Sequence, residues 1–361
     1  MKKLGFGFMR LPRLEDGQVD LVHTQQMVDA FMEAGFTYFD TAHGYLDGQS
    51  ERALKACLTS RYPRERFVLT DKLSPNTFEK EEEIRPLIDA ELEACGVTYF
   101  DYLLMHSMKD VFYEKYTRCR AFEIAKELKA EGKIRHIGMS FHDTPQVLDR
   151  ILAEHPELEA VQIQFNYLDV ENPNVQSRAC YEVCRKHGRQ VLMMEPVKGG
   201  ALADLPAEAA AILDGLGGGS HASYAIRYAA SQEGVLAVLS GMSTLEQVLD
   251  NVSSMTDFRP LSQAETAAVD QVRQVLLAQE VIACTACRYC MDVCSQQIPI
   301  PEIFDIYNRK KRFLEGGWRY ESVTKDRHKA SECLGCGACE QTCPQKLEIR
   351  ACLKRAAEEL E

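Results

Sequence analysis

Eight of the 14 cysteines lie near the C-terminus in two copies of one pattern. The spacing within each copy is C-x2-C-x2-C-x3-C, and Pro344 follows the second copy. The first run consists of Cys284, Cys287, Cys290 and Cys294, and the second of Cys333, Cys336, Cys339 and Cys343. Thiolates at this spacing hold 4Fe-4S clusters. The two runs therefore predict two such clusters, which pass electrons one at a time.

The repeated pattern also predicts how the ligands are shared. In bacterial two-cluster ferredoxins, the fourth cysteine of each run binds the other cluster. Carried over to this chain, that arrangement predicts one set of Cys284, Cys287, Cys290 and Cys343, and another of Cys333, Cys336, Cys339 and Cys294. Residues 295–332, with a helical stretch at 303–313, resemble an α-helical ferredoxin module. Two four-cysteine zinc sites are the alternative, although zinc ribbons usually separate their cysteines into two C-x2-C pairs.

Four residues earlier in the chain form a second candidate site. Asp40, Lys72 and His106 each end a short run of β-forming residues, and Tyr45 follows in the loop after Asp40. Alone, each has an ordinary structural explanation, such as a strand-end cap or a surface charge. A carboxylate, an ammonium, an imidazole and a phenol at consecutive strand ends instead indicate proton-transfer chemistry.

A regular alternation of strands and helices must position these residues. Strands are predicted at 4–8, 37–40, 67–72, 102–106, 134–140, 160–165, 190–195 and 235–240, and helices at 22–34, 84–95, 122–130 and 145–153. Alternating strands and helices pair in parallel. Eight such units in about 250 residues are typical of a (β/α)8 barrel, whose chemistry lies at the C-terminal strand ends. An open doubly wound sheet is the alternative, but the glycines of the first strand lead into Arg10-Leu11-Pro12 rather than into a helix.

The fold class is therefore predicted as α/β, with a TIM barrel followed by a small, mainly α-helical ferredoxin-like domain. We expect the barrel at 1–258, a helical connector at 259–280 and the cluster domain at 281–361, which closes with a helix at 349–360. The other six cysteines (57, 95, 119, 180, 184 and 352) are scattered, and we interpret them as ordinary thiols.

The barrel sequence resembles the aldo-keto reductase family over roughly residues 1–255. The matching segments are GFTYFDTA at 35–42 with Tyr45, GQSE at 48–51, LTDK at 69–72 and DYLLMH at 101–106. The resemblance implies reduction of a small-molecule carbonyl by hydride transfer from NADH or NADPH, with Tyr45 as proton donor. Lys72 would lower the pKa of that tyrosine, Asp40 would orient Lys72, and His106 would polarise the carbonyl.

The same resemblance implies where a nicotinamide cofactor binds. The implied contacts are Ser140, Gln162, Asn166, Pro196, Lys198, Gly199, Ser240, Gly241, Ser243, Gln247 and Asn251. Two positions depart from the common pattern: Phe141 follows Ser140, and Met194 replaces an aromatic residue. Residues 229–258 contain no lysine or arginine for a 2′-phosphate, so we expect NADH to be used at least as well as NADPH.

Composition narrows the classes of partner. The 361 residues carry a net charge of −12, with 42 basic and 54 acidic side chains. Such a chain has no general attraction for nucleic acid or anionic lipid, and no apolar run approaches a membrane span. We therefore expect a cytoplasmic protein, and an anaerobic source because exposed clusters are sensitive to oxygen.

The clusters leave three hypotheses open. In the first, the barrel reduces a carbonyl while the clusters are structural or sense redox state. In the second, the clusters feed electrons to a substrate in the barrel. In the third, the chain is an electron-transfer protein that acts with a redox partner protein, and its barrel serves only as a binding module. Because the C-terminal segment of this family normally covers the substrate pocket, we expect the cluster domain to cover the barrel mouth, with Tyr289 or Trp318 near the pocket.

Overall fold

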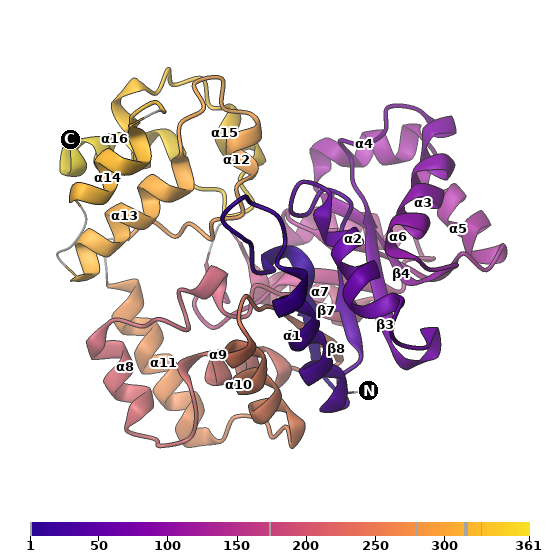
Figure 1. The fold of residues 1–361 in the computed structure, drawn as a ribbon, viewed down its shortest axis with the longest axis horizontal. Helices are drawn as coiled ribbons and strands as arrows, with labels where there is room; N and C mark the ends of the chain where they lie inside the picture. The colour runs from indigo at the N-terminus through magenta and orange to yellow at the C-terminus, as the bar shows by residue number, and fades with distance from the viewer. Residues whose placement is uncertain (1, 173–174, 279–280, 314–316, 326) are drawn as a thin grey trace.

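The computed structural model describes residues 2–172, 175–278, 281–313, 317–325 and 327–361. Within these ranges, eight parallel strands form a closed barrel in chain order, and Figure 1 shows the helices around it. The strands are β1 (Leu4–Gly7), β2 (Tyr38–Asp40), β3 (Val68–Leu73), β4 (Phe100–Met108), β5 (Ile134–Phe141), β6 (Ala160–Gln164), β7 (Gln190–Met194) and β8 (Val235–Gly241). Strand β1 pairs with both β2 and β8, which confirms the predicted barrel and excludes an open sheet.

Helices surround the barrel and then continue into the C-terminal domain. Those of the barrel are α1 (Leu21–Glu33), α2 (Gln49–Leu54), α3 (Glu81–Cys95), α4 (Asp110–Arg118), α5 (Ala121–Ala130), α6 (Pro145–Glu154), α7 (Ser177–Lys186), α8 (Ala207–Asp214), α9 (His221–Ala230), α10 (Leu245–Thr256) and α11 (Gln263–Leu277). Short helical turns are η1 (Phe8–Arg10), η2 (Lys55–Thr59), η3 (Arg64–Arg66), η4 (Lys198–Gly200) and η5 (Ala330–Glu332). Helix α11, the predicted connector, packs against α8 and α9; the domain boundaries themselves stay a prediction.

The C-terminal domain is mainly helical, as expected. It contains α12 (Tyr289–Asp292), α13 (Ile300–Phe313), α14 (Gly317–Thr324), α15 (Ala338–Thr342) and α16 (Ile349–Leu360). Its apolar core is separate from that of the barrel and includes Ile303, Phe304 and Leu353. Several cluster-type cysteines are part of this core or pack against it. The domain therefore folds around the cysteine runs.

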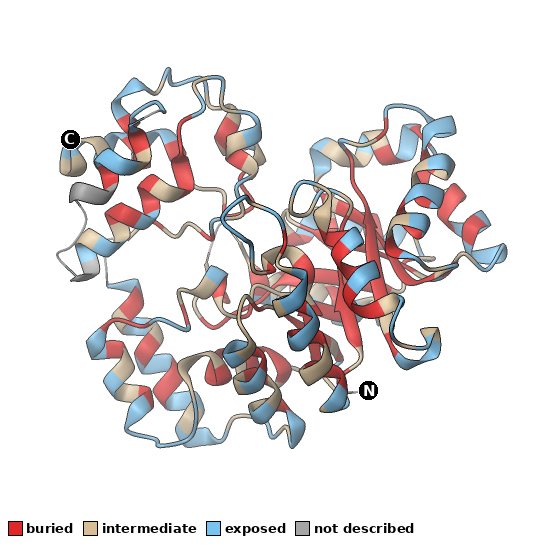
Figure 2. Cartoon of the chain, in the orientation of Figure 1, coloured by how far each residue is buried: buried red, intermediate tan, exposed pale blue. Residues whose placement is uncertain are grey.

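Side-chain alternation along the strands decides which residues face the barrel interior. Tyr38 of β2 bonds Thr70 of β3 through its hydroxyl at 2.6 Å, so both face inward. Because strand side chains alternate between faces, Asp40 and Lys72, each two residues further along, also face inward. Most outward-facing positions are apolar and belong to the core between the strands and the helices. Figure 2 shows the strands mostly in red, the colour of buried residues.

The outward layer of the barrel belongs to an extensive apolar core. The rings of Phe6, Phe31 and Phe39 lie 5.4–6.1 Å apart and join β1, β2 and α1. Each is fully buried, and burying one such side chain stabilises the fold by about 1.5–3 kcal/mol.

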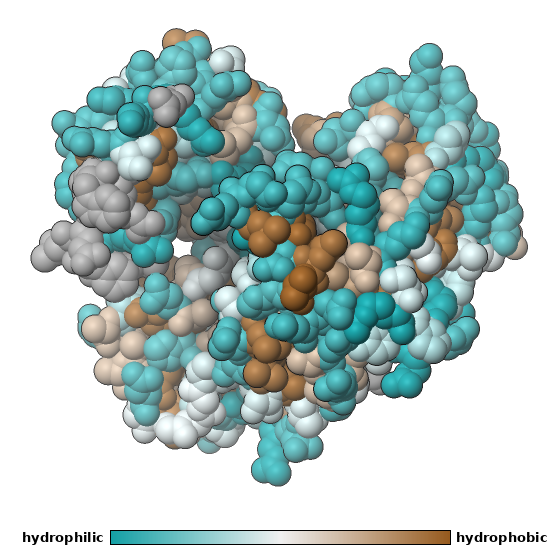
Figure 3. All heavy atoms as spheres, viewed as in Figure 1, coloured by the Kyte–Doolittle hydropathy of each residue, from teal (hydrophilic) through white to brown (hydrophobic). Residues whose placement is uncertain are grey.

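The face of the molecule shown in Figure 3 is mainly hydrophilic, with hydrophobic residues in small separate groups. Among the described helices, none is long and apolar enough to cross a bilayer.

Candidate active site and cysteine sites

A cavity of about 310 Å³ lies at the C-terminal ends of the barrel strands. Three of the four predicted catalytic residues line it: Asp40, Tyr45 and His106. The fourth, Lys72, lies directly beneath and is fully buried. The structure thus brings the four residues together where a barrel enzyme performs its chemistry.

Lys72 and Asp40 form a buried ion pair. The Nζ of Lys72 donates to Asp40 Oδ1 at 2.7 Å and to the carbonyl of Thr41 at 2.6 Å. Gln162 donates from Nε2 to the other carboxylate oxygen of Asp40 at 3.2 Å. Burial raises the pKa of Asp40, and the contacts with Lys72 and Gln162 oppose that rise. The pair therefore fixes the ammonium in one position below the cavity floor.

Tyr45 lies beside this ammonium, with Lys72 Nζ 4.8 Å from the centre of its ring. The expected decrease in its pKa is wrong for the chain as the structure shows it. Burial raises the pKa of Tyr45 well above its ordinary value, the charge of Asp40 raises it further, and Arg10 lowers it. Burial is the larger cause, and Asp40, which is paired with Lys72, adds a negative charge at the same place. The phenol stays protonated at neutral pH, as an ordinary tyrosine does, so it has a proton to give.

His106 is held as a neutral imidazole. Its Nδ1 lies 2.7 Å from Ser74 Oγ, and its ring meets that of Tyr45 edge-on at 5.8 Å. Burial, followed by the charge of Lys72, lowers the pKa of His106 well below its ordinary value. With Nδ1 bonded to Ser74, Nε2 is the nitrogen that can bond a molecule in the cavity. A backbone irregularity in β4 between Met105 and Met108, with Ser107 at φ 53°, shapes this strand end.

Nine of the eleven residues predicted to contact a nicotinamide cofactor line the same cavity. They are Ser140, Gln162, Pro196, Gly199, Ser240, Gly241, Ser243, Gln247 and Asn251. Met194, which stands where related sequences have an aromatic residue, lines it too. Several are tied to one another: Ser243 N donates to Gln247 Oε1 at 2.7 Å, and Asn251 Nδ2 to Ser240 Oγ at 3.0 Å.

The structure places the other two, Asn166 and Lys198, outside the cavity lining. Asn166 donates from Nδ2 to Asp169 and to the carbonyl of Glu195, and it accepts from two backbone amides. Lys198 is buried, with Nζ 2.6 Å from both carboxylate oxygens of Asp169 and 3.1 Å from Gln345 Oε1. In this arrangement the Lys198 ammonium is paired with Asp169 instead of lying in the cavity, where it could bind a phosphate of the cofactor.

The C-terminal domain covers the barrel mouth, as expected. Cys287, Tyr289 and Pro344 line the cavity beside the barrel residues. Arg10 donates from its guanidinium to the carbonyl of Thr285 at 2.7 Å. A side chain at Gly199 (φ 66°) would meet that same carbonyl oxygen at 2.7 Å. The two domains are therefore in close contact at the loop of residues 196–200, which the sequence predicts to contact a cofactor. The side chain of Trp318 lies outside the described residues.

The polar residues of the cavity lining that were not predicted from the sequence include Arg10, His142 and Glu195. Burial lowers the pKa of His142 to about 3. Burial raises the pKa of Glu195, while Lys198 and Arg10 oppose that rise. Each lies just beyond a predicted strand or at its last residue, which was the signal available for finding it.

The eight cysteines of the two runs surround two separate hollows. One is lined by Cys284, Cys287, Cys290 and Cys343, and the other by Cys294, Cys333, Cys336 and Cys339. Zinc with tetrahedral thiolates at 2.3 Å requires sulfur atoms about 3.8 Å apart. Among the described residues, no three of these sulfur atoms lie within 4.8 Å of one another. The spacing fits a larger group than a single ion, and the two hollows divide the cysteines as the crossed ligand sets require.

Comparisons with known proteins agree with this architecture. Residues 3–274 match the model of the aldo/keto reductase family, and residues 283–347 match that of the 4Fe-4S dicluster domain. An NADH-specific methylglyoxal reductase of Escherichia coli is 28% identical over 199 residues, which cover 49% of this chain and 58% of that protein. An aldo-keto reductase of Strobilurus tenacellus is 27% identical over 212 residues, which cover 56% and 60%. The chain thus spans somewhat less than two thirds of these relatives.

Solved structures show the same fold. An aldo-keto reductase from Klebsiella pneumoniae, in complex with NADPH, aligns with a TM-score of 0.61 at 22% identity, covering 75% of this chain and 90% of that one. Because the family model covers the whole barrel and most of α11, the assignment does not depend on any single relative. The chain belongs to the aldo/keto reductase family and carries a C-terminal 4Fe-4S dicluster domain.

Proposed function

We propose that this protein is an NAD(P)H-dependent oxidoreductase that reduces a small carbonyl compound in the barrel cavity. The observation that carries the proposal is the grouping of Tyr45, His106 and the Lys72–Asp40 pair around one cavity. The names of the relatives support the reaction class, since both described above are reductases. The carbonyl compound itself is set by the loops and by the part of the C-terminal domain that covers the mouth.

The residues of the cavity have separate tasks in this proposal. The nicotinamide cofactor, when bound, supplies a hydride to the carbonyl carbon. Tyr45, which like any ordinary tyrosine is protonated at neutral pH, donates its phenolic proton to the oxygen that becomes the alcohol. Neutral His106 donates a hydrogen bond to the same oxygen from Nε2. Lys72, fixed by Asp40, stabilises the phenolate that Tyr45 becomes after the proton has left.

The lining of the cavity supports use of both nicotinamide cofactors, with NADH at least as good as NADPH. Residues 229–258 offer no lysine or arginine, and Lys198 is held by Asp169. Arg10 is the one lysine or arginine among the described lining residues, and its guanidinium is bonded to Thr285. We expect kcat/KM for NADH to equal or exceed that for NADPH in anaerobic steady-state assays over a panel of aldehydes and ketones.

A large preference for NADPH in that assay would contradict this expectation. The variant Arg10→Ala would then show whether Arg10 causes the preference for NADPH. If Arg10 leaves Thr285 to bind the 2′-phosphate, the variant loses the preference for NADPH and keeps its activity with NADH.

We also infer that the two cysteine hollows hold two 4Fe-4S clusters with crossed ligands. Four thiols around each hollow, spaced too widely for zinc, support this inference. Thiolate clusters of this type persist in a reducing compartment, which supports the cytoplasm as location. We place the domain boundaries at 258 and 280, so that the cluster domain begins just before the first run.

One observation favours a second candidate function, in which the clusters exchange electrons with a molecule in the cavity. Cys287 lines both the cavity and the first cysteine hollow. If the two sites are coupled, adding NADH alone to the anaerobic protein should bleach the visible absorbance of the clusters. Absorbance that stays unchanged over many turnover times would favour clusters that are structural or sense redox state.

A further inference from the structure

An acidic cluster lies outside the cavity, in the layer between the barrel and its helices. Asp71 of β3 precedes the inward-facing Lys72, so strand alternation turns its side chain outward. Most outward-facing positions of the barrel are apolar, yet Asp71 is fully buried. Facing it are Glu51 of α2 and Glu91 of α3, which are also buried. Three carboxylates thus replace apolar contacts at one place in the core.

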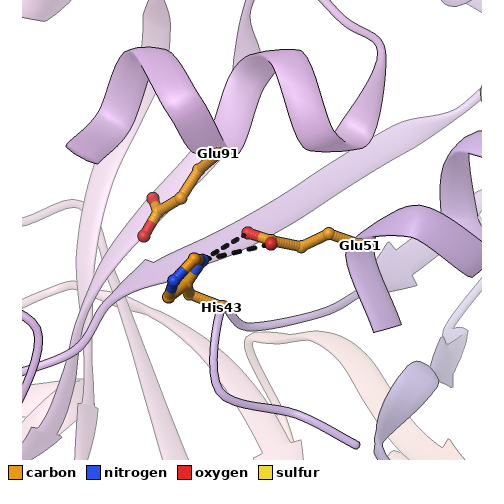
Figure 4. Close-up of side chains that lie close together, drawn as sticks. All are labelled: His43, Glu51 and Glu91. Carbon is orange, nitrogen blue, oxygen red and sulfur yellow. Dashed lines mark hydrogen bonds and ion pairs between the residues drawn. The ribbon is translucent and has the colours of Figure 1, made fainter. Parts of the chain in front are cut away.

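Glu51 and Glu91 lie close to a third side chain, His43 (Figure 4). Ligand atoms of His43, Glu51 and Glu91 all lie within 4.8 Å of one another. A second group of Glu51, Asp71 and Cys95 meets the same limit and shares Glu51 with the first. His43 Nδ1 lies 3.1 Å and 3.4 Å from the two carboxylate oxygens of Glu51. Glu91 and Cys95 are one turn apart on α3 and therefore share a face.

Glu91 is the member of this arrangement whose carboxyl group has no partner among the described residues. Both carboxylate oxygens of Glu91 are buried, and neither has a hydrogen-bond partner among the described residues. Figure 4 shows them turned toward His43. A buried carboxylate without a partner is costly. Among the described residues, none of Glu51, Asp71 and Glu91 forms an ion pair with lysine or arginine. Glu51 faces His43 and raises its pKa, and the charge of Lys72 acts on Asp71, but no described residue pairs with Glu91.

The negative charges of these carboxylates also favour a bound cation. Burial and the charge of Glu51 raise the pKa of Asp71 well above its ordinary value. Burial and the charges of Asp71 and Glu51 raise that of Glu91. The carboxylates thus repel one another. A doubly charged cation would remove this repulsion and give the free oxygens of Glu91 a partner.

We propose that His43, Glu51 and Glu91, with Asp71 and Cys95 alongside, bind a divalent cation of the first transition row. Imidazole, carboxylate and thiol together favour such an ion over Mg²⁺ or Ca²⁺, which prefer oxygen ligands alone. Ligands that coordinate one ion at about 2.0–2.3 Å lie roughly 3–4.5 Å apart, within the limit that these side chains meet. The ion would join the loop that carries Tyr45 to β3 and α3.

Zinc binding to the cluster-loaded protein tests this proposal. The protein is stripped with EDTA under anaerobic conditions, titrated with Zn²⁺ by calorimetry, and its retained zinc is counted after gel filtration. We expect the wild type to retain one Zn²⁺ per chain outside the cysteine runs, with a rise in Tm. We expect Glu91→Gln and His43→Gln to weaken that binding by about 100-fold or more and to abolish the rise in Tm.

Two comparisons make the result decisive. Glu93→Gln, at an exposed position of the same helix, should bind zinc as the wild type does. Zinc held by cluster cysteines would be retained equally by all four proteins, and that result would overturn the proposal, as would a wild type that retains none. If Glu91→Gln does not fold, His43→Gln carries the test, because His43 is only partly buried.

Discussion

Replacing Tyr45 by phenylalanine should lower kcat for carbonyl reduction by about two to four orders of magnitude, since this is the usual contribution of a general acid. The substitution removes only the hydroxyl and leaves the ring against His106 and Lys72. Substrate and cofactor would therefore still bind. Steady-state kinetics with a reduced nicotinamide cofactor under anaerobic conditions measure the effect, which should appear in kcat rather than in KM for the cofactor.

A tyrosine outside the cavity lining provides the control. The hydroxyl of Tyr181 on α7 donates to the carbonyl of Glu233 at 2.7 Å, and Tyr181 is not among the cavity-lining residues. Tyr181→Phe should keep wild-type kcat. Carbonyl reduction by Tyr45→Phe at near the wild-type rate would reject Tyr45 as proton donor and favour a donor such as water or Tyr289.

The crossed ligand sets predict an unusual result for paired cysteine substitutions. Cys287 and Cys343 belong to different runs but line the same hollow, so Cys287→Ala combined with Cys343→Ala should remove one cluster and leave about half of the iron. Cys287 and Cys294 belong to the same run but line different hollows. Their double alanine variant should lose both clusters. Iron and sulfide analysis after anaerobic purification, with electron paramagnetic resonance of the reduced protein, measures the remainder.

The opposite pattern would show that each run binds its own cluster. In that case the pair from one run keeps half of the iron, and the pair from two runs loses all of it. Cys352→Ala serves as the control for the substitution itself, because Cys352 is a buried cysteine of α16 and lines neither hollow. It should retain the iron content of the wild type.

The barrel could be predicted from the sequence because its signals are local. Strands buried on both faces leave short, nearly continuous apolar runs, and each of the eight predicted strands is present with its ends shifted by at most two residues. The catalytic positions followed from the same signal: once β2, β3 and β4 are placed, Asp40, Lys72 and His106 lie at or near their C-terminal ends. The cysteine spacing was equally local.

The residues that could not be predicted depend on partners far away in the chain. Lys198 faces Asp169 and Gln345 rather than the cavity. No local sequence pattern predicts such a pairing. The raised pKa of Tyr45 depends on burial and on Asp40, whereas the sequence suggested only the effect of Lys72. Asp71 and Cys95 looked ordinary because strand register and helix packing are needed to bring them to Glu51.

The contact between Gly199 and Thr285 has a consequence for how the two halves of the molecule influence each other. The loop at 196–200 contributes to the cofactor-type cavity and also receives the cluster domain, through Gly199 against Thr285 and Lys198 against Gln345. A ligand that tightens this loop changes the free energy of docking between the domains. By thermodynamic reciprocity, docking changes the affinity for that ligand by the same factor. The dissociation constant of a nicotinamide cofactor should therefore change when the cluster domain is not intact.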